Sequence, residues 1–195
     1  MARTAHIERR TRETDTTLDL RLDGSGCCEI ATTVEFLDHM LSHVATHGLL
    51  DLSVAARGDI GVDFHHLVED VGIVLGQALI EAIGDKRGLV RYGTGLCPMD
   101  EALVMVCLDL SGRPHLEYGL SIQAPKVGHF DTELGRDFFQ ALARAGALTV
   151  HVRQLSGENA HHILESAFKS LGRALDQATR LDPRREDVPS TKGTL

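Results

Sequence analysis

The stretch His161-His162-Ile163-Leu164-Glu165 decides how this chain is interpreted, because its pattern occurs earlier as His65-His66-Leu67-Val68-Glu69. The two copies lie 96 residues apart in a chain of 195 residues with 11 histidines. A histidine pair followed three residues later by glutamate is rare in a sequence of this composition, so two copies indicate an internal repeat. The chain is therefore expected to consist of two similar halves.

Each copy of the motif has the geometry of a metal-binding site. On a helix the first histidine and the glutamate stand at i and i+4 on one face, so both can reach one ion. The second histidine is turned by about 100° and is expected to serve a second site. Imidazole and carboxylate donors suit manganese, iron, zinc or nickel, whereas magnesium and calcium prefer oxygen. The alternative is a pair of solvated or core-satisfied histidines.

Composition narrows the class of protein. A chain of 21.2 kDa can bury the core of one domain or of two fused halves. A net charge of -8 gives no electrostatic footprint for nucleic acid or an anionic membrane. No apolar run reaches the length of a membrane span and no signal segment is evident, so a cytoplasmic location is expected. The four cysteines lack C-x-x-C spacing and are expected to be reduced.

Hydrophobic periodicity predicts the elements of each half. The first half is expected to contain strands over 5–12, 17–22 and 27–32 forming a meander, a helix over 34–47, a strand over 52–56 and a helix over 65–83. The second is expected to contain a loop over 88–98, a hairpin of strands over 102–110 and 115–122, a helix over 133–146, a strand over 148–154 and a helix over 161–180.

Histidines on the preceding helices extend the candidate site. Aligning the two halves places His39 and Asp137 at one position of the helix before each motif, so we expect both in the metal sites. His43 and His47 follow His39 at i+4 and i+8 along one helix face. A polar face is the alternative for His43, whereas His47, next to a helix-stopping glycine, is assigned to function.

A set of cations and small donors could jointly hold a phosphate. These residues are Arg91, Arg113, Lys169, Ser190, Thr191 and Lys192. The arginine fork and a hydroxyl match phosphate oxygens. Each could also be a solvated surface residue, and the polar tail over 182–195 could be disordered.

Together these residues resemble the imidazoleglycerol-phosphate dehydratase family of histidine biosynthesis along nearly the whole chain. The matching motifs are RTRET (10–14), FLDHML (36–41), HG (47–48), HHLVED (65–70), PMDEAL (98–103), DLSGRP (109–114), GENAHH (157–162), FK (168–169) and STKG (190–193). Asp137 stands where many members have histidine, and Phe64 where they have aspartate. Asp137 can still ligate a hard ion, whereas Phe64 removes a carboxylate that could orient an imidazole.

The resemblance implies an α/β (α+β) fold. One domain would comprise two pseudo-repeats, roughly 1–92 and 93–181, with a substrate-binding tail over 182–195. Each half would be a sheet with two helices, like the second domain of ribosomal protein S5, with the helices between the sheets. The resemblance also implies a homo-oligomeric shell of 24 subunits, whose active sites lie between subunits and hold two Mn²⁺ ions each.

The resemblance also implies roles for individual residues. The metal ligands would be His39, His65, His66, Glu69, Asp137, His161, His162 and Glu165. The substrate-binding residues would be Glu13, His39, His47, Arg91, Arg113, Lys169, Ser190, Thr191 and Lys192. Glu13 and His47 would be catalytic: Glu13 is the candidate for proton transfer, with His47 or a metal-bound water as the alternative.

The implied activity is dehydration of imidazole glycerol phosphate to imidazole acetol phosphate through a metal-bound imidazolate. The electron-rich ring would expel the neighbouring hydroxyl as water. A metal-dependent hydrolase could use the same ligands. A metal-storage or structural shell is the non-enzymatic alternative, and it leaves the phosphate-binding residues unexplained.

Overall fold

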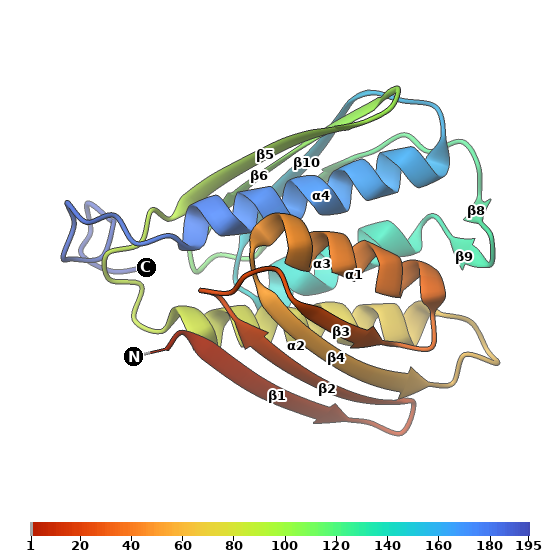
Figure 1. The fold of residues 1–195 in the computed structure, drawn as a ribbon, viewed down its shortest axis with the longest axis horizontal. Helices are drawn as coiled ribbons and strands as arrows, with labels where there is room; N and C mark the ends of the chain where they lie inside the picture. The colour runs from red at the N-terminus through yellow and green to blue at the C-terminus, as the bar shows by residue number, and fades with distance from the viewer. Residues whose placement is uncertain (1) are drawn as a thin grey trace.

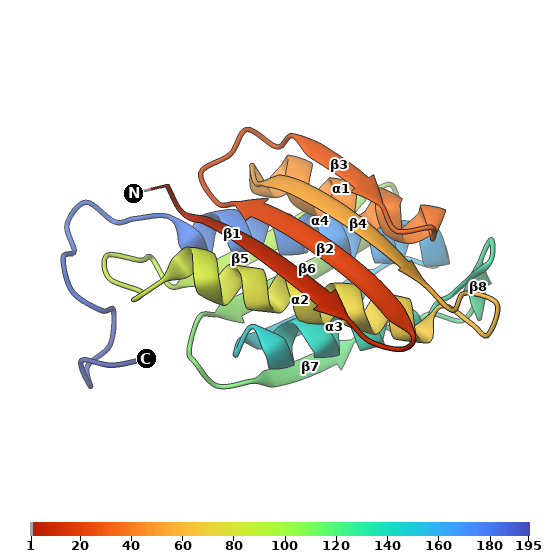
Figure 2. The ribbon, with the colours of Figure 1, turned by 90° about the horizontal axis from the view of Figure 1, so that it is seen from below.

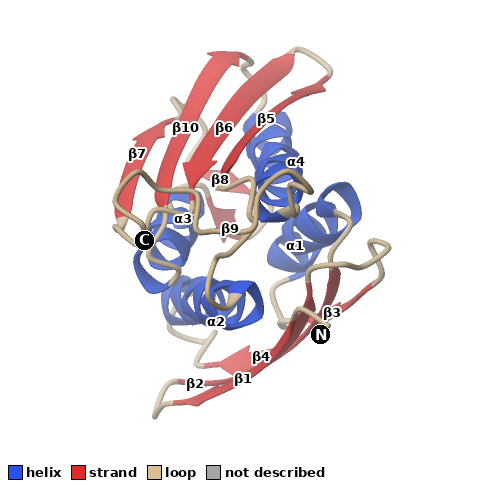
Figure 3. Ribbon diagram, turned by 90° about the vertical axis from the view of Figure 1, so that its left-hand side faces the viewer, coloured by secondary structure: helices blue, strands red, loops and turns tan. Residues whose placement is uncertain are grey.

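The computed structural model describes residues 2–195 and contains two four-stranded sheets with four helices between them (Figures 1 and 3). The first sheet has the order β1 (Thr4–Arg10), β2 (Thr14–Arg21), β4 (Asp51–Gly58), β3 (Cys28–Ala31). The second has the order β5 (Tyr92–Met99), β6 (Ala102–Asp109), β10 (Thr149–Ser156), β7 (His115–Gly119). The helices are α1 (Glu35–Gly48), α2 (His65–Ile83), α3 (Leu134–Ala145) and α4 (Ala160–Thr179), and β8 (Lys126–Val127) pairs with β9 (Phe130–Asp131).

The two halves have the same topology. In the first sheet β4 is antiparallel to β2 and parallel to β3. In the second sheet β10 is antiparallel to β6 and parallel to β7. The predicted fold class is confirmed: each half is a sheet with two helices, and the helices lie between the sheets.

Three local predictions are wrong. Residues 27–32 do not complete a meander, because β3 pairs with β4 and not with β2. Residues 102–110 and 115–122 do not form a hairpin, because β10 lies between β6 and β7. Residues 88–98 are not a loop throughout, because β5 begins at Tyr92. In both sheets a strand from later in the chain inserts beside an earlier one, and local periodicity carries no information about that pairing.

Glycines explain why β5 escapes a sequence-based prediction. A Cβ added at Gly93 would lie 1.9 Å from the carbonyl oxygen of Ala174, and one added at Gly95 would lie 1.9 Å from that of Ser170. The backbone of β5 therefore packs directly on α4, and only glycine permits this approach. In the sequence alone, the same glycines are typical of a loop.

Each helix pair combines one helix from each half. The first sheet packs on α1 and α2 (Figure 2), and the second packs on α3 and α4. Between these layers α1 contacts α4 and α2 contacts α3 (Figure 3). The largest fully buried side chains include Phe138, Phe139, Phe168, Leu18, Leu20, Leu37, Met40 and Leu41. This pairing across the halves decides which side chains of the two motifs meet.

The C-terminal segment after α4 is held against the loop before β5. The amide of Asp182 donates to the carbonyl of Gly88 (2.8 Å), and the amide of Gly88 donates to the carbonyl of Asp187 (2.9 Å). Arg91 donates through Nη1 to the carbonyl of Pro189 (2.7 Å). Within residues 2–195, no helix has both the length and the apolar character that a membrane span requires.

Candidate active site

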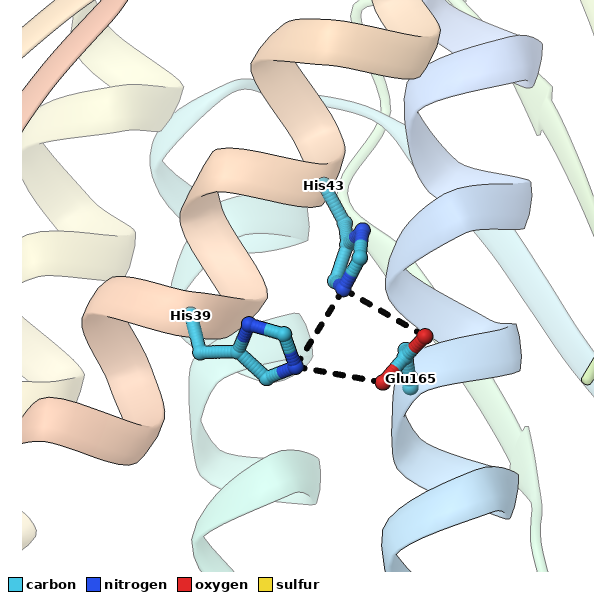
Figure 4. A group of neighbouring side chains, drawn as sticks. All are labelled: His39, His43 and Glu165. Atoms are coloured by element: carbon cyan, nitrogen blue, oxygen red, sulfur yellow. Dashed lines mark hydrogen bonds and ion pairs between the residues drawn. The ribbon is translucent and has the colours of Figure 1, made fainter.

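Helices α1 and α4 bring together four metal-ligating side chains, His39, His43, His161 and Glu165, which we call the α1–α4 cluster. His39 and His43 occupy successive turns of α1 and face Glu165 on α4 (Figure 4). His39 Nε2 lies 3.1 Å from Glu165 Oε2, and His43 Nε2 lies 3.4 Å from Glu165 Oε1. The two histidine Nε2 atoms are 3.3 Å apart.

Glu165 is the centre of this cluster. His161, one turn earlier on α4, places Nε2 3.0 Å from its Oε2, and Lys169, one turn later, places Nζ 2.5 Å from its Oε1. The carboxylate side chain is only 6% exposed. Burial by itself would raise the pKa of Glu165, but hydrogen bonds from Lys169 and His161 outweigh it and lower the pKa to about 2. The carboxylate is therefore ionised at neutral pH.

The histidines further along α1 are kept neutral. Burial lowers the pKa of His43 to about 4. His47, one turn later, stacks on His43 with ring centroids 5.7 Å apart, and burial together with Lys169 lowers its pKa as well. Both imidazoles thus have an unprotonated ring nitrogen at neutral pH, the form that binds metals or accepts protons.

A second group of donors lies at the other helix pair. His65 on α2 places Nδ1 3.3 Å from Oδ2 of Asp137 on α3, and Glu69 lies one turn after His65 on the exposed side of α2. We call these three residues the α2–α3 cluster. His39 and Asp137 therefore each join the motif of the opposite half, because α1 packs on α4 and α3 packs on α2.

The second histidine of each motif makes separate contacts. His66 donates through Nδ1 to Asp59 (Oδ2 at 3.0 Å), and His162 donates through Nδ1 to Glu101 (Oε2 at 2.7 Å). These hydrogen bonds raise the pKa of both histidines. The hydrogen bond from His162 also lowers the pKa of Glu101 to about 2. A carboxylate on Nδ1 fixes the orientation of the ring and leaves Nε2 as the nitrogen that can bind a metal, as is common for metal-binding histidines.

The turn between β1 and β2 places Glu13 beside the first motif. Glu13 Oε1 lies 3.9 Å from His66 Nε2, and the carboxylate side chain is 55% exposed. The turn between β5 and β6 has the matching position in the second half, where Asp100 Oδ2 lies 3.8 Å from His162 Nε2. The Nε2 atoms of His66 and His162 thus each have a carboxylate within 4 Å.

Five of the six predicted phosphate-binding residues line one hollow of about 580 Å³ at the C-terminal segment. They are Arg91, Arg113, Ser190, Thr191 and Lys192. Arg91 is buried and forms a two-point pair with Asp109 (2.6 and 3.0 Å), whereas the side chain of Arg113 is 68% exposed. Lys169, the sixth, lies instead in contact with Glu165 and with Met99.

The hollow and the α1–α4 cluster lie at opposite ends of α4. Arg91 donates its amide to the carbonyl of Ala178 near the end of α4, whereas Glu165 lies in the second turn of that helix. Thirteen residues separate Glu165 from Ala178, which is about 20 Å along a helix axis. A single ring carrying a short phosphorylated chain cannot reach both within one copy of the chain.

The α1–α4 cluster fits a divalent metal ion. Single ligand atoms of His39, His43 and Glu165 all lie within 4.8 Å of one another, a spacing that one ion between them can bridge. Imidazole nitrogens with one ionised carboxylate are a donor set for manganese, iron, zinc or nickel. The burial of Glu165 among basic side chains gives such a cation a fixed anionic partner.

Three residues that contact the predicted ligands were not assigned as ligands or ligand partners from sequence. His43 carried a signal, its i+4 spacing from His39, which also fits a polar helix face. Asp59 carried none, and Glu101 lies within the matched motif PMDEAL without a role assigned to it; each reaches its histidine from a loop or turn. Glu101 is 61 residues from His162 in the chain, and no local pattern relates them.

Comparison with known proteins gives a consistent family. The imidazoleglycerol-phosphate dehydratase family model matches residues 32–175. An imidazoleglycerol-phosphate dehydratase of Synechococcus sp. (strain WH7803) is 57% identical over 196 residues, covering 100% of this chain and 97% of its own. That of Desulforamulus reducens is 58% identical over 193 residues, covering 99% and 98%.

Solved structures agree with the sequence comparison. The Staphylococcus aureus enzyme superposes with a TM-score of 0.83 at 41% identity, covering 92% of this chain and 99% of its own. The Pyrococcus furiosus enzyme superposes with a TM-score of 0.85 at 41% identity, covering 97% and 100%. Fold and relatives define a hydro-lyase, an enzyme that eliminates water from its substrate. The chain belongs to the imidazoleglycerol-phosphate dehydratase family.

Proposed function

We propose that this chain converts imidazole glycerol phosphate to imidazole acetol phosphate and water in histidine biosynthesis. The observation that carries this proposal is the presence of a group of potential metal ligands, His39, His43 and Glu165, and of an anion hollow on one chain. Imidazole nitrogens are good metal donors, and a phosphate suits arginine, lysine and hydroxyl groups. The names of the relatives support the same substrate.

Two Mn²⁺ ions per active site form the metal part of the proposal. His39, His161 and Glu165 would hold one ion, and His65, Glu69 and Asp137 the other. His66 and His162, which are bound to carboxylates through Nδ1 and so have Nε2 left for a metal, would complete the sites of neighbouring copies. When bound, the ions would supply Lewis acidity that favours the deprotonated form of the substrate imidazole.

The chain's own groups move the protons in this proposal. The imidazole ring loses a proton, the hydroxyl on the carbon next to the ring takes one up and leaves as water, and Glu13 removes the proton from the next carbon. The resulting enol becomes the ketone by tautomerisation. The Glu13 carboxylate is exposed and lies 3.9 Å from Nε2 of His66, a proposed metal ligand, which supports this role. His47 is the alternative base, because its lowered pKa keeps it neutral near pH 7.

The anion hollow would hold the phosphate of the substrate. Arg113, Ser190, Thr191 and Lys192 would bind the phosphate oxygens directly, next to the paired and buried Arg91. Lys169 would approach the same phosphate from the copy that supplies Glu165. Binding at this remote group fixes the reacting carbons, so it contributes to turnover as well as to substrate affinity.

Assembly of copies is part of the proposed function. Along α4, Glu165 lies about 20 Å from the residue that contacts Arg91. This separation supports active sites that combine the candidate metal ligands of one copy with the anion hollow of another. We propose the homo-oligomer of 24 subunits for this assembly and the cytoplasm for its location.

Removal of metal tests the proposed function. Metal-free protein is expected to release no imidazole acetol phosphate, and added Mn²⁺ is expected to restore the reaction. Circular dichroism before and after chelation controls for unfolding. Full turnover by folded, metal-free protein would refute the proposal. Release of inorganic phosphate from simple esters, without dehydration, would favour a metal-dependent hydrolase instead.

A further inference from the structure

The two helix-borne clusters differ in donor chemistry. The α1–α4 cluster presents three imidazoles and one carboxylate, from His39, His43, His161 and Glu165. In the α2–α3 cluster the imidazole of His65 contacts the carboxylate of Asp137, and the carboxylate of Glu69 follows one turn after His65 on α2. The pseudo-symmetry of the fold therefore does not extend to the ligands. One cluster is rich in nitrogen and the other in oxygen.

His43 is one source of this difference. It stands one turn after His39 on α1, and the matching position one turn after Asp137 on α3 is Ala141, a buried side chain without a donor. The side chain of His43 is 18% exposed and places Nε2 within 3.4 Å of both His39 Nε2 and Glu165 Oε1. It thus faces the cluster, as Figure 4 shows.

We propose that His43 acts as an additional metal donor, and that it gives the α1–α4 cluster a stronger preference for zinc over manganese than the α2–α3 cluster has. The inference rests on the proposed function, because it distinguishes the two metal sites of that proposal. Imidazole donors suit zinc, whereas carboxylate donors suit manganese. Zinc binds more tightly than manganese to most sites of nitrogen and oxygen donors, so the difference shows when zinc is limiting: zinc would then fill the α1–α4 cluster first and leave the α2–α3 cluster to manganese.

Element-specific X-ray scattering tests this proposal without reference to turnover. Metal-free, full-length protein is equilibrated with one zinc ion per chain and an excess of manganese and is crystallised, and anomalous maps at the two absorption edges locate each ion. Zinc is expected between α1 and α4, and manganese between α2 and α3. The same ion mixture at both positions, or no ion near His43 Nε2, would overturn the proposal.

Calorimetric zinc titration of variants gives an independent measurement. His43→Gln keeps a polar side chain of similar size and is expected to weaken zinc binding at the tighter site by roughly 10- to 100-fold. His151→Gln, on the second sheet away from both clusters, is the matched control and should bind zinc like the wild type. Equal zinc affinity of wild type and His43→Gln, with both folded by circular dichroism, would overturn the proposal.

Assays of dehydration with manganese as the only metal separate this inference from the proposed function. Zinc placed at the α1–α4 cluster supports the inference even in a protein that dehydrates nothing. If the manganese enzyme dehydrates the substrate but zinc is found equally at both clusters, the inference is overturned and the proposed function stands.

Discussion

Glu165 shows how much a single residue contributes to this site. Its carboxylate is buried, and a buried charge is unfavourable unless polar partners satisfy it. Here the partners are His39, His43, His161 and Lys169, which all lie within 3.4 Å of its oxygens. These partners come from two helices, so the carboxylate also links α1 to α4.

The lowered pKa of Glu165 predicts a pH dependence of stability in the metal-free protein. The pKa falls from 4.5 to about 2 on folding, so its stabilising contribution is complete above 4.5 and is lost as the pH falls toward 2. Between pH 6 and pH 4 this loss is expected to be about 1 kcal/mol. Urea unfolding of Glu165→Gln should therefore show a flatter pH profile than wild type.

Glu81→Gln provides the control for this measurement. Glu81 is an exposed carboxylate on α2, away from Glu165. Its variant should keep the wild-type slope between pH 6 and pH 4. Parallel profiles for wild type and Glu165→Gln would contradict the assignment.

At the scale of elements, α4 organises both the core and the site. Its buried face carries Phe168 and two serines whose hydroxyls donate to strand carbonyls, Ser166 to Cys97 (2.6 Å) and Ser170 to Val104 (2.7 Å). The contact with β5 is made through backbone, because Gly95 leaves room for the carbonyl of Ser170. This close contact fixes the position of α4, and with it the positions of His161 and Glu165 relative to α1.

Substitution of Gly95 tests the close contact between α4 and β5. Gly95→Ala would place a methyl group 1.9 Å from the Ser170 carbonyl oxygen, so helix and strand must move apart. The free energy of unfolding is expected to fall by about 1–3 kcal/mol. Urea denaturation measures this loss.

Gly61→Ala is the matched control, because nothing lies within 4 Å of a Cβ at Gly61. Its free energy of unfolding should stay within about 0.5 kcal/mol of wild type. If Gly95→Ala unfolds at the same urea concentration as Gly61→Ala, the contact is more adaptable than described.

At the scale of the whole molecule, the two similar halves give two helix pairs, each of which carries candidate metal ligands. Both clusters derive from a motif at the start of a helix, and each recruits a side chain from the other half. The anion hollow forms at the far end of α4. The molecule thus carries parts of a site at positions that one small substrate cannot bridge.

Complementation between variants tests whether copies share active sites. Glu165→Gln should lose a metal ligand, and Arg113→Ala should lose a phosphate contact, so each alone is expected to be nearly inactive. In mixed assemblies formed by co-expression, about a quarter of pairings between a cluster and a hollow should have both parts intact. Dehydration by purified mixed assemblies measures the recovery. Mixtures no more active than the separate variants would contradict sites between copies.

The sequence by itself determined the local features of this protein. The repeated motif, the helix that begins at each copy and the i,i+4 contact of His161 with Glu165 all follow from helical periodicity within one segment. The fold of two sheets with the helices between them was predicted through the resemblance to the family whose motifs the chain matches, and not from periodicity. His43 stayed undecided because one spacing fits both a ligand and a polar face.

Only the tertiary structure decided which segments meet. It inserted β4 and β10 between earlier strands, revealed β5 where glycines suggested a loop, and paired α1 with α4. These choices depend on contacts between residues distant in the chain, whose energies come from packing and not from local periodicity. The same contacts place His43 beside Glu165 and Glu101 beside His162. They also place the candidate metal ligands and the anion hollow at opposite ends of α4.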